Sequence, residues 1–415
     1  MTTTRWRCTS ESGRSPSSLA DSARRSPHYQ FLPNCSANFS RVHSRSDAKA
    51  ILCPMVRDEE GFLSEWVGYY YMHGFSHVMV FDDSSSDGFM DELRPWIDRG
   101  VVSVRRNFSF ESLNNRDFPD MSKYQRKISI KTAAEVVCKL QALEWGYDIF
   151  VSLDLDEYIV PNDPAVTIVD SIIEFGKVPQ CTMFCFEKLN FASSPHIAEP
   201  VHLLTIEAYQ ARNPVVGKMD SFMTVMPKCG YFLRHPSYNE ELVRYVAYCC
   251  TLHGCVDRDR LKNTTVCSEG GKKGYFKQLW LQCTLAGRIH HYSRSFEKFA
   301  LKARTWETAR DGTAQDATSY SVPMFLKRSY GWLYDPSALR YSCQLREVLA
   351  QVTGNATFYR AGSNWIRNQE FGRPLSNPKK SLRGGKSQTR LDGSQHRNRG
   401  RQRVRDSGKG SLKSG

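Results

Sequence analysis

The chain has no long apolar run and no pair of cysteines with CxxC spacing. No stretch of about 18 consecutive apolar residues occurs in the 415 residues, so neither a transmembrane helix nor a signal peptide can be read from it. The missing CxxC pairs remove the most convincing zinc-site signature, although the chain contains 13 cysteines. A glycine-rich phosphate loop is also missing after the first apolar run, where Arg57-Asp58-Glu59-Glu60 stands instead, and this counts against a nucleotidyltransferase.

Acidic residues are scarce at both ends of the chain. Residues 1–50 carry 8 Arg and Lys against 3 Asp and Glu, and residues 377–415 carry 12 against 2. Because the net charge is +14, the middle of the chain is close to neutral. The Ser- and Arg-rich residues 1–49 cannot bury enough apolar surface to fold, so we predict a disordered N-terminal segment. We predict a disordered basic tail for residues 377–415, either simply solvated or an arm for an anionic surface, without the aromatic residues that base stacking needs.

The cysteines and the N-X-S/T sequons bear on the cellular compartment. Five cysteines gather around His253, and a zinc knuckle, disulfides formed in an oxidising lumen and free thiols remain alternatives for them: Cys249, Cys250, Cys255, Cys267 and Cys283. Sequons occur at Asn34, Asn38, Asn107, Asn263 and Asn355. They fit a protein of the secretory pathway, although such triplets often arise by chance.

Short apolar runs begin to alternate with amphipathic segments at Ala50. Strands are expected at residues 50–56, 78–81, 101–104, 148–153 and 182–186, and helices at 60–73, near 90–97, at 124–145, near 166–175 and at 295–308. Gly74 is the expected stop of the first helix. Strands that alternate with helices are typical of a parallel sheet. We therefore predict an α/β fold with a Rossmann-like, mostly parallel central sheet flanked by helices over residues 50–310, and an extension, residues 311–376, packed on this domain.

An Asp-Leu-Asp triplet follows the strand expected at residues 148–153. Ligands of open α/β sheets bind at the carboxyl ends of the strands, where this triplet falls. Asp154 and Asp156 are two residues apart, so on an extended backbone they point to the same side and can share a hard divalent cation such as Mn²⁺ or Mg²⁺. Surface or helix-capping acids are the alternative. His290 and His291 either complete the coordination shell or form a purely structural pair.

A second acidic loop, Asp82–Gly88, follows the strand expected at residues 78–81. Carboxylates at a strand end suit hydrogen bonds to ribose hydroxyls or to the uracil edge of a nucleotide. A polar turn without a ligand is the alternative interpretation.

Four ordered motifs resemble those of glycosyltransferase family 92 and the related family 2-like group. They are residues 58–66 (DEEGFLSEW), 77–88 (HVMVFDDSSSDG), 153–158 (LDLDEY) and 291–299 (HYSRSFEKF). The chain departs from the family at Asp58, where Asn is frequent, at Tyr70, where His is frequent, and at Lys188, where Trp is usual. The match is therefore better on the donor side than on the acceptor side.

The resemblance implies a GT-A fold, a nucleotide-sugar donor, expected to be a UDP-sugar, and a cofactor Mn²⁺ or Mg²⁺ held by Asp154, Asp156 and His291. The expected nucleotide-sugar-binding residues are Arg57, Glu59, Asp82, Asp83, Asp87 and Asp154. Family members transfer galactose with inversion onto glycan acceptors, generally as type II Golgi membrane proteins. We therefore expect a hexosyltransferase of the Golgi or another secretory lumen, associated with the membrane through an anchor that an incomplete or mis-started N-terminus would omit.

An inverting transfer needs a general base, usually Asp or Glu, near the acceptor hydroxyl. The preferred candidate is Asp220, which lies in a polar interruption between apolar runs, and the others are Glu187, Glu240, Glu241 and Asp257. Two alternative functions stay open: a catalytically inactive GT-A-like protein that acts as an interaction module through its basic tail, and a nucleotidyltransferase. We do not expect nucleic acid as a partner.

Overall fold

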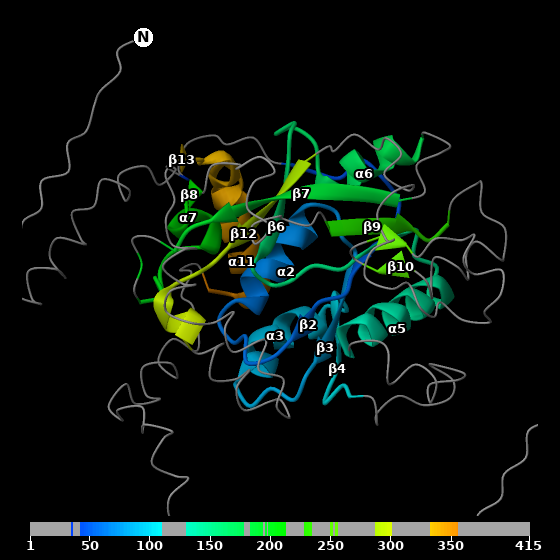
Figure 1. Cartoon of the computed structure of the whole chain (residues 1–415), viewed down its shortest axis with the longest axis horizontal. Coiled ribbons are helices and arrows are strands. Elements are labelled where there is room, and N and C mark those ends of the chain that lie inside the picture. Colours follow the sequence, from blue (N-terminus) through cyan, green and yellow to red (C-terminus); the bar gives the residue numbers. More distant parts are fainter. Residues whose placement is uncertain are drawn as a thin grey trace, which may run out of the picture. The chain divides into compact units, whose positions relative to one another are not determined.

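Short parallel strands form one half of the central sheet in the computed structural model (Figure 1). The structure describes residues 35, 42–109, 130–177, 183–193, 196, 198–212, 228–234, 250–251, 254–255, 287–300 and 333–355, all within one unit, residues 1–369. β1 (Ala50–Leu52) lies between β3 (His77–Asp82) and β5 (Ile149–Val151) and is parallel to both. β3 also pairs in parallel with β2 (Met55–Val56) and β4 (Val102–Arg105). The carboxyl ends of these strands therefore meet at one edge.

Antiparallel pairings dominate the other half of the sheet. β9 (Lys228–Phe232) lies between β5 and β7 (Met183–Phe191) and is antiparallel to both. β12 (Gly287–Tyr292) runs parallel to β7 and antiparallel to β6 (Glu157–Pro161). Two short strands, β8 (Ala211–Arg212) and β13 (Leu333–Tyr334), continue the sheet beyond β7, and β10 (Cys250–Thr251) and β11 (Gly254–Cys255) form a separate hairpin.

Helices cover both faces of the parallel half. Successive strand residues point to opposite faces and therefore pack in two separate apolar clusters. Leu52, Val80 and Val151 pack in the cluster that contains residues of α2 (Leu63–Met72), α3 (Phe89–Asp98), α6 (Ile168–Gly176) and α11 (Ser342–Thr353). Their neighbours Ile51 and Phe150 pack in the second cluster, with α5 (Ile130–Glu144). Figure 1 shows α2 beside α11, with α5 apart from them. The predicted α/β class, with a central, mostly parallel sheet flanked by helices, is confirmed.

The first expected helix corresponds to α2, which ends where the sequence pattern predicts. Gly74 has a φ of +93°, in the left-handed region that glycine adopts without strain. At the other end of α2, the carboxylate of Glu92 from α3 accepts the backbone N–H groups of Gly61 and Ser64 at 2.6 and 2.7 Å. This contact supplies the start of α2 with an acceptor that its own Phe62 position lacks.

Residues 42–49 contact the domain, although the sequence assigns them to a disordered N-terminal segment. Val42 is buried, its N–H donates to the Gln344 side chain at 2.8 Å, and the Gln344 amide donates to the Val42 carbonyl at 2.7 Å. Two hydrogen bonds and a buried side chain hold this segment against α11, so the folded domain begins before Ala50.

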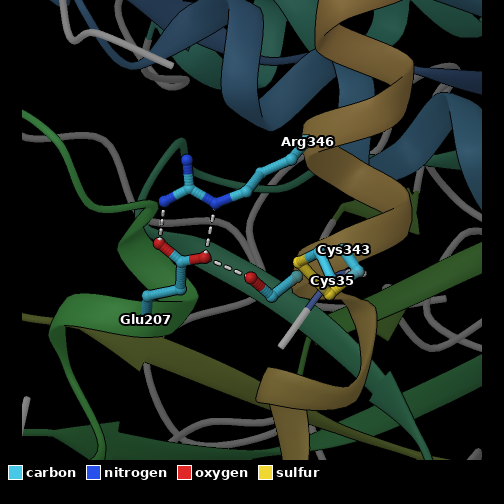
Figure 2. Close-up of a disulfide and its surroundings, with 5 residues drawn as sticks. Cys35, Glu207, Cys343 and Arg346 are labelled. Atoms are coloured by element: carbon cyan, nitrogen blue, oxygen red, sulfur yellow. Dashed lines mark hydrogen bonds and ion pairs between the residues drawn. A yellow bond between two sulfur atoms is a disulfide. The ribbon is translucent and has the colours of Figure 1, made fainter. Parts of the chain in front are cut away.

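Residues of α11 are tied to distant parts of the chain (Figure 2). Cys343 forms a disulfide with Cys35. One turn further along, Arg346 donates from Nε to Glu207 of α7 (Thr205–Ala208) at 2.8 Å, and the hydroxyl of Ser342 donates to the same carboxylate. A short 3-10 helix, Ser337–Tyr341, precedes α11. In the part of the chain that the structure covers, no helix combines the length and apolarity needed to cross a bilayer.

Candidate active site

The Asp-Leu-Asp triplet forms a tight turn between β5 and β6. Together with Glu157, the first residue of β6, we call it the acidic turn. The backbone N–H of Glu157 donates to the Asp154 carbonyl at 3.0 Å, and the Glu157 carboxylate accepts the Asp154 N–H at 2.9 Å. Since the chain turns here, the alternation of an extended strand does not set the directions of the two aspartates, and their surroundings differ. The turn lies after the carboxyl end of β5, as the sequence predicts.

Asp154 faces two lysines. Lys131, in the first turn of α5, donates to one carboxylate oxygen, and Lys228 of β9 donates to the other at 2.6 Å. Burial alone would raise the pKa of Asp154, but the two ammonium groups hold it well below its usual range. Asp154 is therefore ionised and already paired with cations supplied by the chain.

Glu157 is buried at the start of β6 and also faces two lysines. Its Oε1 accepts Lys188 of β7 at 2.7 Å and its Oε2 accepts Lys228 at 2.6 Å. Its backbone carbonyl accepts Trp66 Nε1 and the Tyr70 hydroxyl, both at 3.0 Å. Two aromatic side chains of α2 therefore hold the start of β6 in place through their polar atoms. Because Glu157 also accepts the Asp154 N–H, the acidic turn is held with it.

Asp156 faces His291 of β12. Asp156 Oδ1 lies 3.6 Å from His291 Nε2, and the other ring nitrogen, Nδ1, lies 2.9 Å from Oδ1 of Asn190 on β7. Because an amide oxygen only accepts hydrogen bonds, Nδ1 carries the proton and the neutral ring presents the lone pair of Nε2 to the carboxylate. Burial and Lys188 both lower the pKa of His291, which favours that neutral ring.

These residues fit a divalent cation. Asp156, Glu157 and His291 each offer a ligand atom, and the three atoms lie within 4.8 Å of one another. An imidazole lone pair and a carboxylate that face each other repel unless a cation lies between them, and two ligands each about 2.1 Å from one ion lie roughly 3 to 3.5 Å apart. Metal-binding histidines commonly donate their other N–H to a carbonyl-type oxygen, as His291 does to Asn190. Glu157, with both oxygens on lysines, is less available than Asp156.

The histidine pair divides into two roles. His290 is buried, its ring stacks on Phe191 with centroids 4.3 Å apart, and its Nδ1 lies 3.3 Å from the Tyr292 hydroxyl. Burial lowers its pKa to about 3. His290 is therefore a packed core residue, whereas His291, one position further along β12, lies at the acidic turn.

The expected nucleotide-binding loops are bonded to each other. The backbone N–H of Glu60 donates to Asp87 at 2.6 Å, the N–H of Asp58 donates to the Ser85 hydroxyl at 3.0 Å, and Arg57 lies 3.7 Å from the Asp83 carboxylate. Burial raises the pKa of Asp87 to about 6. Residues 57–60 and 82–88 therefore form one hydrogen-bonded unit at the same sheet edge as the acidic turn.

Two of the expected nucleotide-binding carboxylates are engaged by arginines. Asp82 is fully buried and accepts Arg106 Nε at 2.7 Å and the Ser85 N–H at 2.8 Å. Glu59 accepts Arg294 Nη1 at 2.6 Å and lies 3.2 Å from Lys298 Nζ. Arg57, Asp83 and Asp87 are the more exposed members of the set.

The structure describes one of the five general-base candidates. Asp220, Glu240, Glu241 and Asp257 lie outside the described residues. Glu187 is described: it is exposed on β7, where its carboxylate lies 3.9 Å from Arg288. The base therefore stays a sequence prediction.

Several residues of the site carry no local sequence signal. Lys131 comes from α5, Lys188 and Asn190 from β7, and Lys228 from β9, elements that are remote in sequence and meet only in the folded chain. Arg294 lies inside the 291–299 motif, so its position, although not its partners, could be found from the sequence.

The parallel half of the sheet thus carries an acidic turn at its carboxyl edge, where open α/β sheets bind their ligands. Residues 52–217, two fifths of the chain, match the family model "Glycosyltransferase family 92". The match confirms the predicted resemblance, and with it the glycosyltransferase class, for these residues. No match to the chain was found among curated proteins.

Solved structures of TarS from S. aureus are also similar. The chain aligns with TarS at 13% identity over 37% of this chain and 24% of TarS (TM-score 0.24), and with TarS 1–349 in complex with UDP at 13% identity over 44% and 46% (TM-score 0.25). TarS 1–349 alone aligns at 11% identity over 78% of this chain and 93% of that one (TM-score 0.29). The chain thus spans about a quarter of TarS and under half of the UDP-bound form, and likenesses this weak do not identify a shared fold.

Proposed function

We propose that the protein is a glycosyltransferase that moves a sugar from a nucleotide-sugar donor to a glycan acceptor. The family match over residues 52–217 supports the class. Within it, we propose a UDP-sugar donor with galactose as the first candidate, dependence on Mn²⁺ or Mg²⁺, and inversion at the transferred carbon.

The observation that carries this proposal is the approach of Asp156 to His291, 3.6 Å apart, with Asn190 behind the imidazole. The two ligand atoms come from different elements, and each is fixed from behind. The backbone carbonyl of Asp156 accepts the Tyr292 N–H at 2.8 Å, which ties the acidic turn to β12. A pre-arranged pair of this kind suits the recognition of a hard cation.

A divalent cation held by Asp156 and His291, with Asp154 or Glu157 nearby, would neutralise the donor diphosphate as it leaves. Side chains of the protein hold the proposed ligands in place and offer contacts to the nucleoside. Asn190 holds the proton on Nδ1 of His291 and keeps Nε2 free of a proton. Lys228 bridges Asp154 and Glu157 and so prevents two neighbouring carboxylates from repelling each other. The unit of residues 57–60 and 82–88 offers Arg57, Asp83 and Asp87 to the nucleoside.

An inverting transfer also needs a base that takes the acceptor proton. We retain Asp220 as the first candidate. Its replacement by Asn should lower kcat strongly while donor binding stays unchanged, because a base acts on the acceptor and not on the nucleotide.

The function is tested by screening nucleotide sugars for cation-dependent release of nucleoside diphosphate and for cation-dependent thermal stabilisation, since a donor that binds only the folded state must raise its stability. Asp156→Asn should abolish both effects. Asp98→Asn, at an exposed carboxylate on the last residue of α3, is the matched control and should behave like wild type. Full release by Asp156→Asn in the presence of a chelator would rule out the metal mechanism.

Deletion of the basic tail separates the enzyme from the alternative, an inactive interaction module. Deletion of residues 377–415 should leave sugar transfer intact if the GT-A domain is the enzyme. A wild-type protein that releases no nucleoside diphosphate from any donor, and whose anionic partners are lost with the tail, would support the alternative.

We propose that the protein folds in an oxidising secretory lumen, with the Golgi as the first candidate. Three disulfides support this: Cys35–Cys343, Cys53–Cys138 and Cys185–Cys229. The sequon residues Asn107 and Asn355 are both exposed, so each is accessible to glycosylation. Expression in a eukaryotic cell should yield a band that shifts on treatment with an N-glycosidase and loses part of that shift in Asn107→Gln. A protein without glycan and with all thiols reduced would contradict the proposal.

A further inference from the structure

Three lysines from three different elements surround the carboxylates of the acidic turn. Lys228 of β9 contacts both Asp154 and Glu157 at 2.6 Å, and Lys188 of β7 contacts Glu157 at 2.7 Å. Lys131 of α5 contacts Asp154. Their side chains are 5%, 17% and 33% exposed respectively. Of these three lysines, Lys131 is therefore the most accessible to a ligand.

Among the described residues, the charges of this cluster balance without a ligand. Three carboxylates, Asp154, Asp156 and Glu157, stand against these three lysines, and the imidazole of His291 is neutral. A cation that binds the carboxylates leaves an excess of positive charge, and the doubly charged diphosphate of a nucleotide sugar cancels it. Cation and diphosphate should therefore strengthen each other's binding.

Lys131 is best placed to meet that diphosphate. Lys228 bridges two carboxylates in the interior and is held there by both, since Asp154 and Glu157 raise its pKa above the usual range against the effect of burial. Lys131 has a long flexible stem, lies at the start of a 15-residue helix whose amide dipoles add positive potential, and pairs with the partly exposed Asp154 rather than with buried Glu157.

We propose that Lys131 binds the diphosphate of the donor, and that Asp154 holds this lysine at the site while the donor is absent. The inference rests on the proposed function and names one residue of its donor site. A lysine that merely clamps the acidic turn would contribute to stability and leave affinity for phosphate unchanged, so binding and stability measurements separate the two roles.

The test compares Lys131→Ala and Lys131→Arg with Lys177→Ala, a control at a 65% exposed lysine that follows α6 and pairs with Glu174 of that helix. Isothermal titration calorimetry measures binding of inorganic pyrophosphate and of UDP to the full chain in a constant excess of Mg²⁺. Lys131→Ala should weaken both about tenfold, while Lys131→Arg should stay within about threefold of wild type, because a charge-assisted contact to phosphate is lost in the first and kept in the second. Titration with Mn²⁺ alone should show tighter binding to Lys131→Ala, since Asp154 then lacks one competing cation.

Equal pyrophosphate affinity in Lys131→Ala and wild type, with a lower unfolding temperature in the variant, would overturn the assignment and leave Lys131 as a clamp. If Lys131→Ala fails to fold, Lys131→Met, which keeps the apolar stem, takes its place, and Lys131→Arg alone must still retain affinity. A wild-type protein that binds neither pyrophosphate nor UDP overturns the proposed function together with the inference. Binding to wild type that the Lys131 variants do not alter overturns the inference only.

Discussion

Arg294 donates from Nη2 to the backbone carbonyl of Leu155, at 2.7 Å, in the middle of the acidic turn. Its Nη1 donates to Glu59 at 2.6 Å, and its guanidinium carbon lies 3.8 Å from the centre of the Phe62 ring. Arg294 is buried and adopts a φ of +59°. One side chain from the 291–299 motif therefore joins the loop after β2 to the turn after β5, so that these motifs, remote in sequence, share one structural core.

Replacement of Arg294 by Met should destabilise the protein by about 3 kcal/mol, because it removes the guanidinium that pairs with buried Glu59 at 2.6 Å. Arg294→Lys should cost less, about 1 to 2 kcal/mol, since one ammonium cannot reproduce two directed bonds. Urea denaturation measures both values. Arg288→Met, at an exposed arginine of β12, is the control and should stay within about 0.5 kcal/mol of wild type. Equal stability of Arg294→Met and Arg288→Met would mean that the buried network does not hold the turn.

The sequence predicts the parallel half of the fold well because its signals are local. The apolar strands and amphipathic helices between Ala50 and Val151 occur within a few residues of their predicted bounds, and each is set by neighbours in the chain. β9 is different. It inserts antiparallel between β5 and β7, and no periodicity within its five residues indicates which strands it will join.

The site, like the fold, is predictable where its signals are local in the sequence. Asp154, Asp156 and His291 are predicted from motif and position, whereas Glu157 is not, and the partner of each carboxylate depends on long-range pairing. Lys228 reaches Asp154 only because β9 takes that unpredicted place, and Asn190 reaches His291 because β7 and β12 pair in register. The sequence pattern therefore treats Asp154 and Asp156 as equivalent ligands, whereas their neighbours differ.

Asn190 should be needed for metal affinity although it contacts no ligand atom of the proposed site. Its Oδ1 accepts Nδ1–H of His291, so Asn190→Ala frees the ring to rotate and to change tautomer. We expect Mn²⁺ affinity to fall roughly 10-fold or more, measured by calorimetry or by electron paramagnetic resonance. Asn190→Asp, which keeps an acceptor oxygen, should retain more affinity than Asn190→Ala. Unchanged Mn²⁺ affinity in Asn190→Ala would argue against His291 as a ligand.

His73 should make the protein acid-sensitive. It is fully buried at the end of α2, its ring packs against Tyr69 and Tyr341, and neither ring nitrogen has a hydrogen-bond partner among the described residues. Burial, aided by Arg340, lowers its pKa to about 3. Below pH 6.5 the unfolded chain binds a proton that the folded one refuses, so the free energy of unfolding falls as pH falls, by about 1.4 kcal/mol per pH unit until the folded pKa is reached.

His73→Phe removes this titration and keeps a ring. The difference in free energy of unfolding between His73→Phe and wild type should be constant above pH 7. It should change in favour of the variant by about 1 kcal/mol between pH 6.5 and 5.5, because the unfolded histidine is already half protonated at pH 6.5. Urea denaturation over this range measures it. A difference that does not vary with pH would mean that His73 accepts a proton in the folded protein as readily as in the unfolded one.

The disulfide between Cys35 and Cys343 should contribute measurably to stability, because it closes a very long loop of 308 residues in the unfolded chain. Native disulfides typically contribute about 2 to 4 kcal/mol, less than the roughly 5 to 6 kcal/mol that chain entropy alone would give for a loop of this length. The double variant Cys35→Ser/Cys343→Ser, which leaves no single thiol behind, should unfold at a lower temperature under oxidising conditions and match wild type when both are fully reduced. α11 should stay folded in the variant, because Arg346 still contacts Glu207 and Leu345 and Leu349 still pack over Gly68. Mapping by mass spectrometry checks the pairing itself: a wild-type protein with Cys343 bound to another cysteine would contradict the bond, and an unchanged melting temperature in the double variant would show that it adds no stability.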